Sequence, residues 1–149
     1  MKKIKNHSSL SRFLFLLYCG AMIWLLFGQR WGETSAIADL HLNVNLVPLR
    51  TIRQYLGLLH HEVYFLHAIV NLAGNVVMFI PLGFLLPRIW QKFRNFFRTF
   101  FAIAAMVIVV ELLQYFTLLG SMDIDDLILN LSGATVGYIS WQIYSHNRL

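Results

Sequence analysis

The sequence is poor in charge for its length. Only 13% of its 149 residues are Asp, Glu, Lys or Arg, whereas a soluble domain would carry about 25%. Hydrophobic residues make up 58% of the chain. Both values disfavour an ordinary water-soluble domain, and together they predict a membrane protein.

Two further absences narrow the classes of function. The chain has a single cysteine, Cys19, so no intramolecular disulfide can form and the redox compartment is not encoded. It also lacks a basic patch interleaved with aromatic residues. The net charge of +5 therefore does not indicate a nucleic-acid partner, and we expect it to reflect topology and contact with anionic lipid headgroups.

Long uncharged runs are the main feature that is present. Residues 13–29, 63–87 and 127–147 carry no Asp, Glu, Lys or Arg, and over 99–122 the one charged residue is Glu111. About 20 helical residues cross a hydrocarbon core of about 30 Å, so each run is long enough to span a bilayer. We predict a single-domain, all-α four-helix bundle in the membrane, with transmembrane helices at about 11–28, 65–87, 99–119 and 126–145.

The first of these segments also has the basic start and apolar run of a signal peptide. However, the small-residue site at 36–38 lies too far beyond the apolar run for ordinary processing. We therefore interpret the segment as a helix that is retained in the protein.

Basic residues are distributed unevenly between the predicted loops. Nine of the twelve lie in the amino-terminal tail, in the loop between the second and third helices, or in the carboxyl tail. The last loop, at 121–125, carries only acidic charge. The positive-inside rule therefore predicts that both termini lie in the cytoplasm.

The first extracytoplasmic loop, about 29–64, is too long for a simple connector. Apolar and polar residues alternate over 40–46, which predicts a short extended segment. An apolar face at helical spacing then predicts an amphipathic helix on the outer leaflet: Ile52, Tyr55, Leu56 and Leu59. Arg50 and Arg53 lie off that face, and they would either contact phosphates or Glu111 or anchor the helix at headgroup level.

Eight polar or acidic side chains lie within or at the rim of the apolar segments. A charged group at mid-membrane costs about 2.5–3.5 kcal/mol on insertion scales, so such residues usually face a bundle interior and mark a site. In the predicted topology all eight lie toward the extracytoplasmic side. They are Asn71, Asn75, Glu111, Gln114, Asp123, Asp125, Asp126 and Asn130.

These polar residues are in phase within each helix. In the last helix they continue into two glycines as one stripe: Asp126, Asn130, Gly133 and Gly137. The glycine spacing is the small-residue pattern that lets a second helix approach closely. We therefore expect the last helix to pack on the second or the third. Polar groups from three helices would then meet in one pocket that opens away from the cytoplasm.

Structural roles compete with binding for several of these residues. Asp123 precedes the last helix, as an N-cap would. Asn71 and Asn75 would contribute about 0.6 kcal/mol each if they only form interhelical hydrogen bonds. Glu111 is harder to explain structurally, because no Lys or Arg lies in any predicted span. It would be protonated, paired with an arginine of the first loop, or bound to a cation.

Four short motifs occur in order along this region. They are N-x-x-P at 45–48, N-x-x-x-F-x-P-x-G at 75–83, E-x-x-Q at 111–114 and D-x-x-D-x-x-x-N-x-x-G-x-x-x-G at 123–137. The combination resembles the VanZ-like family of small bacterial membrane proteins over about 43–140, with the first helix outside the match. The resemblance implies a four-span protein of the bacterial cytoplasmic membrane, whose namesake is associated with resistance to the lipoglycopeptide teicoplanin. It implies no particular reaction.

Two functions are compatible with such a pocket. In the first, the protein binds without catalysis and changes what the outer leaflet or cell wall presents to the antibiotic. Its partners would be membrane lipids, a lipid-linked cell-wall precursor or the lipoglycopeptide itself, and the glycines could also support a homo-oligomer. The ligand-binding residues would be Asn71, Asn75, Glu111, Gln114, Asp123, Asp126 and Asn130, with Arg50 and Arg53 as candidate phosphate contacts.

In the second, the protein is a small intramembrane enzyme acting on a lipid phosphate or diphosphate. Glu111, Asp123 and Asp126 would hold Mg²⁺ or Ca²⁺ through hard oxygen ligands, and the amide side chains would orient the substrate. This function ranks second because the sequence has no clear nucleophile–base pair, phosphate-binding glycine loop or thiol site. A channel ranks third, since four helices without an inverted repeat would form a pore only as an oligomer.

Overall fold

The computed structural model describes residues 4–28, 44–117 and 119–147. Most of these residues are helical, so the predicted all-α class is confirmed. The elements in chain order are α1 (Ile4–Ile23) with the π-helical turn η1 (Trp24–Gly28), β1 (Val44–Asn45), α3 (Arg50–Leu58), α4 (Phe65–Ile89), the 3-10 turn η2 (Gln91–Arg94), α5 (Phe96–Phe116), β2 (Met122–Asp123) and α6 (Ile124–His146).

Three helical segments are long and apolar enough to cross a membrane: Ser9–Gly28, Phe65–Ile89 and Phe96–Phe116. They coincide with the first three spans expected from the sequence. The last helix, α6, has 23 residues and is about 35 Å long at 1.5 Å per residue. It is not one of the three, because polar residues such as Asn130 and Gln142 lower its hydropathy. A fourth span in α6 therefore stays a prediction.

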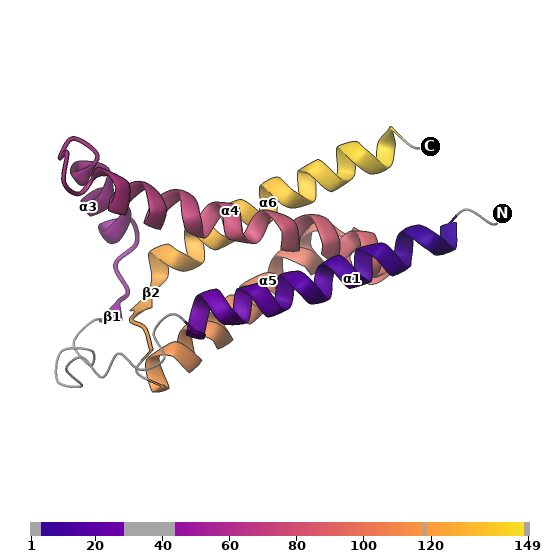
Figure 1. Cartoon of the computed structure of the whole chain (residues 1–149), viewed down its shortest axis with the longest axis horizontal. Helices are drawn as coiled ribbons and strands as arrows, with labels where there is room; N and C mark the ends of the chain where they lie inside the picture. The colour runs from indigo at the N-terminus through magenta and orange to yellow at the C-terminus, as the bar shows by residue number, and fades with distance from the viewer. Residues whose placement is uncertain (1–3, 29–43, 118, 148–149) are drawn as a thin grey trace.

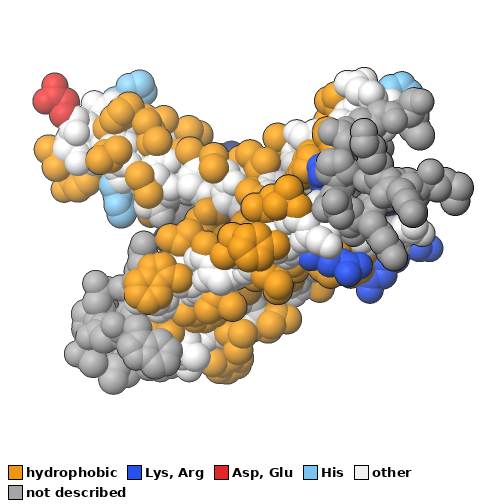
Figure 2. Space-filling view, turned by 45° about the vertical axis from the view of Figure 1, so that its right-hand side comes forward, with side chains coloured by type: hydrophobic (Ala, Val, Ile, Leu, Met, Phe, Trp, Pro, Cys, Tyr) orange, Lys and Arg blue, Asp and Glu red, His pale blue; other side chains and the backbone are white. Residues whose placement is uncertain are grey.

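The long helices run lengthwise through the molecule (Figure 1). The start of α1, the end of α6 and η2 lie at one end, whereas α3, β1 and β2 lie at the other (Figure 1). In Figure 2 the Lys and Arg side chains gather at the end where α1 starts. We call this the basic end and the opposite one the loop end. Such a charge distribution is what the positive-inside argument requires, and the orientation in a membrane stays a prediction.

Helix α6 packs against α4 through a seam of small residues. A Cβ atom on Gly133 would lie 1.9 Å from the carbonyl oxygen of Val76, and one on Gly137 would lie 2.0 Å from that of Ile80. A Cβ atom on Gly83 of α4 would lie 1.9 Å from a carbonyl oxygen of α6. The backbone of each helix thus occupies the space that a side chain on the other would need. Of the two partners expected for the last helix, the second helix, α4, is the one that these glycines contact.

An apolar core lies beside this seam. Helix α1 is tied to it by the Tyr18 hydroxyl, which donates a hydrogen bond to the Met78 carbonyl oxygen of α4 at 2.8 Å. The buried core residues come from α1, α4, α5 and α6: Met22, Phe79, Leu82, Leu86, Ile103, Val107 and Ala134. Buried polar side chains lie on both sides of this core: Ser11 and Thr99 toward the basic end, and Glu111, Asp125 and Asn130 toward the loop end.

Part of the long first loop is ordered against the start of α6. β1 pairs in parallel with β2, in a register that joins Val44 to Met122 and Asn45 to Asp123. The segment expected to be amphipathic forms the helix α3, and its location on the outer leaflet stays a prediction. Residues 29–43 lie outside the described part of the chain, and they include most of the predicted extended segment and the small-residue site at 36–38.

Candidate functional site

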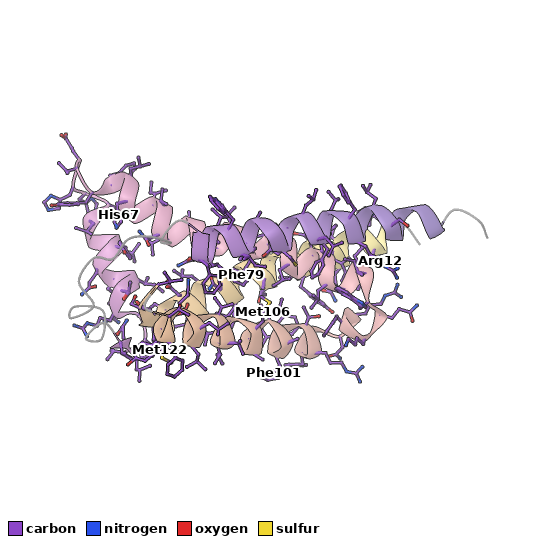
Figure 3. The ribbon with its side chains drawn as sticks, turned by 60° about the horizontal axis from the view of Figure 1, so that its bottom comes forward. Arg12, His67, Phe79, Phe101, Met106 and Met122 are labelled. Carbon is purple, nitrogen blue, oxygen red and sulfur yellow. The ribbon has the colours of Figure 1, made fainter. Side chains whose placement is uncertain are left out.

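A cavity of about 340 Å³ lies between η1 and the halves of α4, α5 and α6 that are near the loop end. Its apolar walls include Phe79, which lies between the helices in Figure 3, whereas Phe101 on the outer side of α5 points away from them. Six of the eight polar residues singled out from the sequence line this cavity: Asn71, Asn75, Glu111, Gln114, Asp126 and Asn130. Polar groups from three helices therefore meet in one place, as expected. That this place binds a ligand stays a prediction.

The closest polar contact across the cavity joins α4 to α6. The Asn75 side-chain amide donates a hydrogen bond to Oδ1 of Asp126 at 2.6 Å. Within largely apolar surroundings this hydrogen bond is screened little by water. This contact ties the polar half of α6 to the same helix that its glycines contact.

Asn130 lies one turn further along α6 and is 5% exposed. Its Oδ1 atom is buried and accepts no hydrogen bond from any described residue. Leaving a buried acceptor without a donor costs about 1–3 kcal/mol, so most such groups in folded proteins are paired. Within the described part of the chain, no other buried side-chain oxygen or nitrogen lacks a partner in this way. Hydrogen bonding within the described part of the protein therefore does not explain why a polar side chain lies at position 130.

Glu111 faces the cavity from α5 and is 7% exposed. Its Oε2 atom accepts a hydrogen bond from the backbone N–H of Asp123 at 3.3 Å, which links α5 to β2. The predicted alternative, a pairing with an arginine of the first loop, is not formed by Arg50 or Arg53. Both are exposed on α3, and neither lines the cavity. Their predicted contact with phosphates stays a prediction, and its place would be the protein surface.

Two amides at the edge of the cavity already have partners within the protein. Gln114 Nε2 donates to the Leu26 carbonyl oxygen at 2.9 Å and so joins α5 to the η1 turn at the end of α1. Asn71 Nδ2 donates to the carbonyl oxygen of His67, four residues earlier in the same helix, at 3.0 Å. Of the two asparagines of α4, Asn75 is the one whose described hydrogen bond joins two helices.

Asp125 lies outside the cavity and is 0% exposed. Its Oδ1 accepts the backbone N–H of Leu49 at 2.5 Å, and its Oδ2 accepts those of Thr51 at 2.7 Å and Ile52 at 3.1 Å. These amides belong to the first turn of α3, where the helix dipole favours a negative charge. Leu49, which precedes α3, has a left-handed φ of 65°, so the anchored chain takes a conformation that is rare for a leucine.

Asp123 completes the same anchor. Its Oδ1 accepts hydrogen bonds from Asn45 Nδ2 at 3.0 Å and from the N–H of Asp125 at 2.8 Å, which makes it the N-cap of α6. Its Oδ2 accepts the Thr51 hydroxyl at 2.6 Å. The capping interpretation is therefore confirmed. We call Asp123, Asp125, Asn45 and Thr51 the loop anchor.

The loop anchor separates the three acids predicted to hold a metal ion. Glu111 and Asp126 line the cavity, but Asp123 does not, and hydrogen bonds from the loop engage both of its oxygens. Among the residues that the structure describes, no three His, Cys, Asp or Glu side chains are placed to hold a metal ion. The predicted ligand set of Glu111, Asp123 and Asp126 is therefore not assembled around one point.

Comparison with known proteins supports one family. Residues 13–145 match the family model described as VanZ/LLP1, a match longer than the predicted 43–140 and one that includes the first helix. The chain is also similar to the protein VanZ of Enterococcus faecium, with 27% identity over 129 residues that cover 86% of this chain and 71% of that protein. No solved structure matches.

Proposed function

The chain belongs to the VanZ/LLP1 family, and from this premise we propose that it is a multi-pass protein of the bacterial cytoplasmic membrane that lowers susceptibility to lipoglycopeptide antibiotics. Its polar cavity would act by binding a lipid headgroup or a cell-wall precursor at the extracytoplasmic side. The observation that carries the proposal is Asn130, a nearly buried amide whose oxygen has no donor among the described residues and which lines that cavity.

An empty polar cavity is energetically unfavourable in a membrane. In hydrocarbon surroundings every polar group must find a partner within the protein, so a polar cavity among apolar helices is disfavoured unless something fills it. Asn71, Asn75, Glu111, Gln114, Asp126 and Asn130 all line it. A ligand that supplies hydrogen-bond donors would lower this cost, which favours binding as the role of the cavity.

The topology that we propose has four spans with both termini in the cytoplasm. The start of α1 and the end of α6 lie at the basic end, together with Arg88, Lys92, Arg94 and Arg98 near η2. With α6 as the fourth span, the positive-inside rule puts this end in the cytoplasm and the cavity in the outer half of the membrane. A headgroup of the outer leaflet would then reach the cavity directly.

The metal-dependent enzyme finds less support than this binding function. Its three candidate ligands do not meet, because Asp123 belongs to the loop anchor. The remaining acids of the cavity, Glu111 and Asp126, would then act in ligand binding.

Expression in a susceptible bacterium tests the proposal. Wild-type protein should raise the inhibitory concentration of teicoplanin, whereas vancomycin, which lacks the acyl tail, should be affected less. Asn130→Leu should lose the effect at equal abundance in the membrane. Gln142→Leu is the matched control, because Gln142 is an exposed amide in the other half of the same helix. Equal teicoplanin susceptibility with and without the wild-type gene would contradict the proposal.

A further inference from the structure

Resting on that proposed function, we infer that the cavity selects a positively charged nitrogen, namely the primary ammonium group of a membrane lipid, and disfavours an anionic phosphate. The inference combines the charge of the cavity, the way its hydrogen-bond donors are used, and the oxygen of Asn130 that no described residue pairs. Each of the three favours a ligand group that carries a positive charge and donates hydrogen bonds.

The charge of the cavity is of one sign. Glu111 and Asp126 both line it, and among its described lining residues none is Lys, Arg or His. A cation that enters this site favours the ionised form of both carboxyl groups, whereas a phosphate disfavours it. Arg50 and Arg53, the residues expected to contact phosphates, are exposed on α3 outside the lining.

The donors and acceptors of the cavity also differ in how far partners within the protein already pair them. Three side-chain amides donate within the protein: Asn75 to Asp126, Gln114 to the Leu26 carbonyl, and Asn71 to the His67 carbonyl. Among the described residues, the buried side-chain atom that lacks a partner is an acceptor, Asn130 Oδ1, and no buried side-chain N–H group lacks one. An ammonium group has three N–H donors and no acceptor, which matches acceptors on Glu111, Asp126 and Asn130.

Access to the cavity favours a lipid as the source of this ammonium group. Leu25 and Val70 line the cavity and are 43% and 60% exposed, so its rim is apolar and open at the surface of the helices. In a bilayer that surface meets acyl chains. A volume of about 340 Å³ is at the low end for ligand sites, which suits a headgroup whose tails stay outside.

Native mass spectrometry of the full-length protein with two lipids tests the inference. Phosphatidylethanolamine has the amine, and N-acetyl-phosphatidylethanolamine keeps the phosphate and tails but blocks it. We expect the first to be retained about tenfold more, the factor that follows from losing one hydrogen bond to a charged group. Equal retention of the two lipids would overturn the ammonium assignment and leave the proposed lipid binding intact. Retention of neither would count against both.

A third arm separates the lipid from a soluble amine. Glycerophosphoethanolamine carries the same headgroup without tails, and we expect it to displace the lipid only at concentrations about 100-fold higher, because contact of about three or four CH₂ groups of the tails with the apolar rim is worth that factor. Displacement at equal concentration would overturn the lipid as the source of the ammonium group.

Two variants test which residues hold the ammonium group. Glu111→Gln should reduce the preference for the free amine about tenfold, whereas Glu62→Gln, which removes the same charge from an exposed loop residue, should leave it unchanged. Asn130→Asp adds a third carboxyl group and should raise the preference. An unchanged preference in Glu111→Gln, or a lower one in Asn130→Asp, would overturn the assignment. The comparison of the two lipids on wild-type protein decides the inference even if a variant fails to fold.

Discussion

Asp125 and Asp126 are neighbours in the chain, yet their surroundings differ. Asp125 belongs to the loop anchor, where it is fully buried and accepts three backbone hydrogen bonds. Asp126 lines the cavity beside Asn130, whose oxygen has no described donor. In the loop anchor, donors of the protein engage the carboxylate oxygens. In the cavity, the Asn130 oxygen accepts no hydrogen bond from any described residue. This contrast separates a structural site from a candidate binding site only one residue away.

The largest effect should come from removing the acceptor of the loop anchor. Asp125→Ala leaves three backbone N–H groups of the α3 region without their acceptor, so the free energy of unfolding should fall by about 3 kcal/mol or more. Asp126→Ala breaks the bond to Asn75 and should cost about 1 kcal/mol. Equilibrium unfolding in detergent measures both. Equal losses for the two variants would show that the contrast between the two acids is wrong.

The glycine seam supports both regions, because it holds α6 against α4. Gly133→Ala places a Cβ atom on the Val76 carbonyl oxygen, and separating the helices should lower the free energy of unfolding by about 2 kcal/mol. Gly20→Ala in α1 is the control, since no atom lies within 4 Å of its added Cβ. Unfolding in detergent should show no loss for the control. A similar loss in both variants would show that an added methyl group lowers stability without any contact at the seam, and would contradict the role of the seam.

A smaller effect should distinguish the two asparagines of α4. Asn75→Ala removes the 2.6 Å hydrogen bond between helices and should lower the free energy of unfolding by about 1 kcal/mol. Asn71→Ala removes a bond within its own helix, and the loss should be within about 0.5 kcal/mol. The same unfolding measurement compares them. A larger loss for Asn71 than for Asn75 would reverse the roles that the structure assigns.

Helical periodicity explains why much of the cavity could be predicted from the sequence. Residues three or four apart share a face of a helix, so Glu111 with Gln114, and Asp126 with Asn130, had to point the same way once the helices formed. The spacing of Gly133 and Gly137 likewise indicated a close helix contact. These are local patterns, and uncharged runs supplied the helices that carry them.

The loop anchor could not be predicted in the same way. The partners of Asp125 are backbone N–H groups more than seventy residues earlier, and a backbone group leaves no trace in the sequence. Asp123 was interpreted as a candidate N-cap, but it was also grouped with the binding residues, although its oxygens accept hydrogen bonds from Asn45 and Thr51. The one available signal was the surplus of acids beyond a single cap. Arg50 and Arg53 were misjudged as possible neighbours of Glu111 because helical phase does not say where a loop helix docks.

The smallest effect on stability should be the most informative one. Asn130→Leu replaces a buried amide by an apolar side chain of similar size, and the amide oxygen has no described donor to lose. The free energy of unfolding should therefore change by less than about 1 kcal/mol, or rise, because removing an unpaired buried polar group is close to neutral or stabilising. Unfolding in detergent measures it, with Gln142→Leu as the exposed control on the same helix. If Asn130 served only the fold, its loss would destabilise the protein as Asp125→Ala does. A variant that folds as stably as the wild type but loses its bound lipid would show that this amide is kept for a ligand.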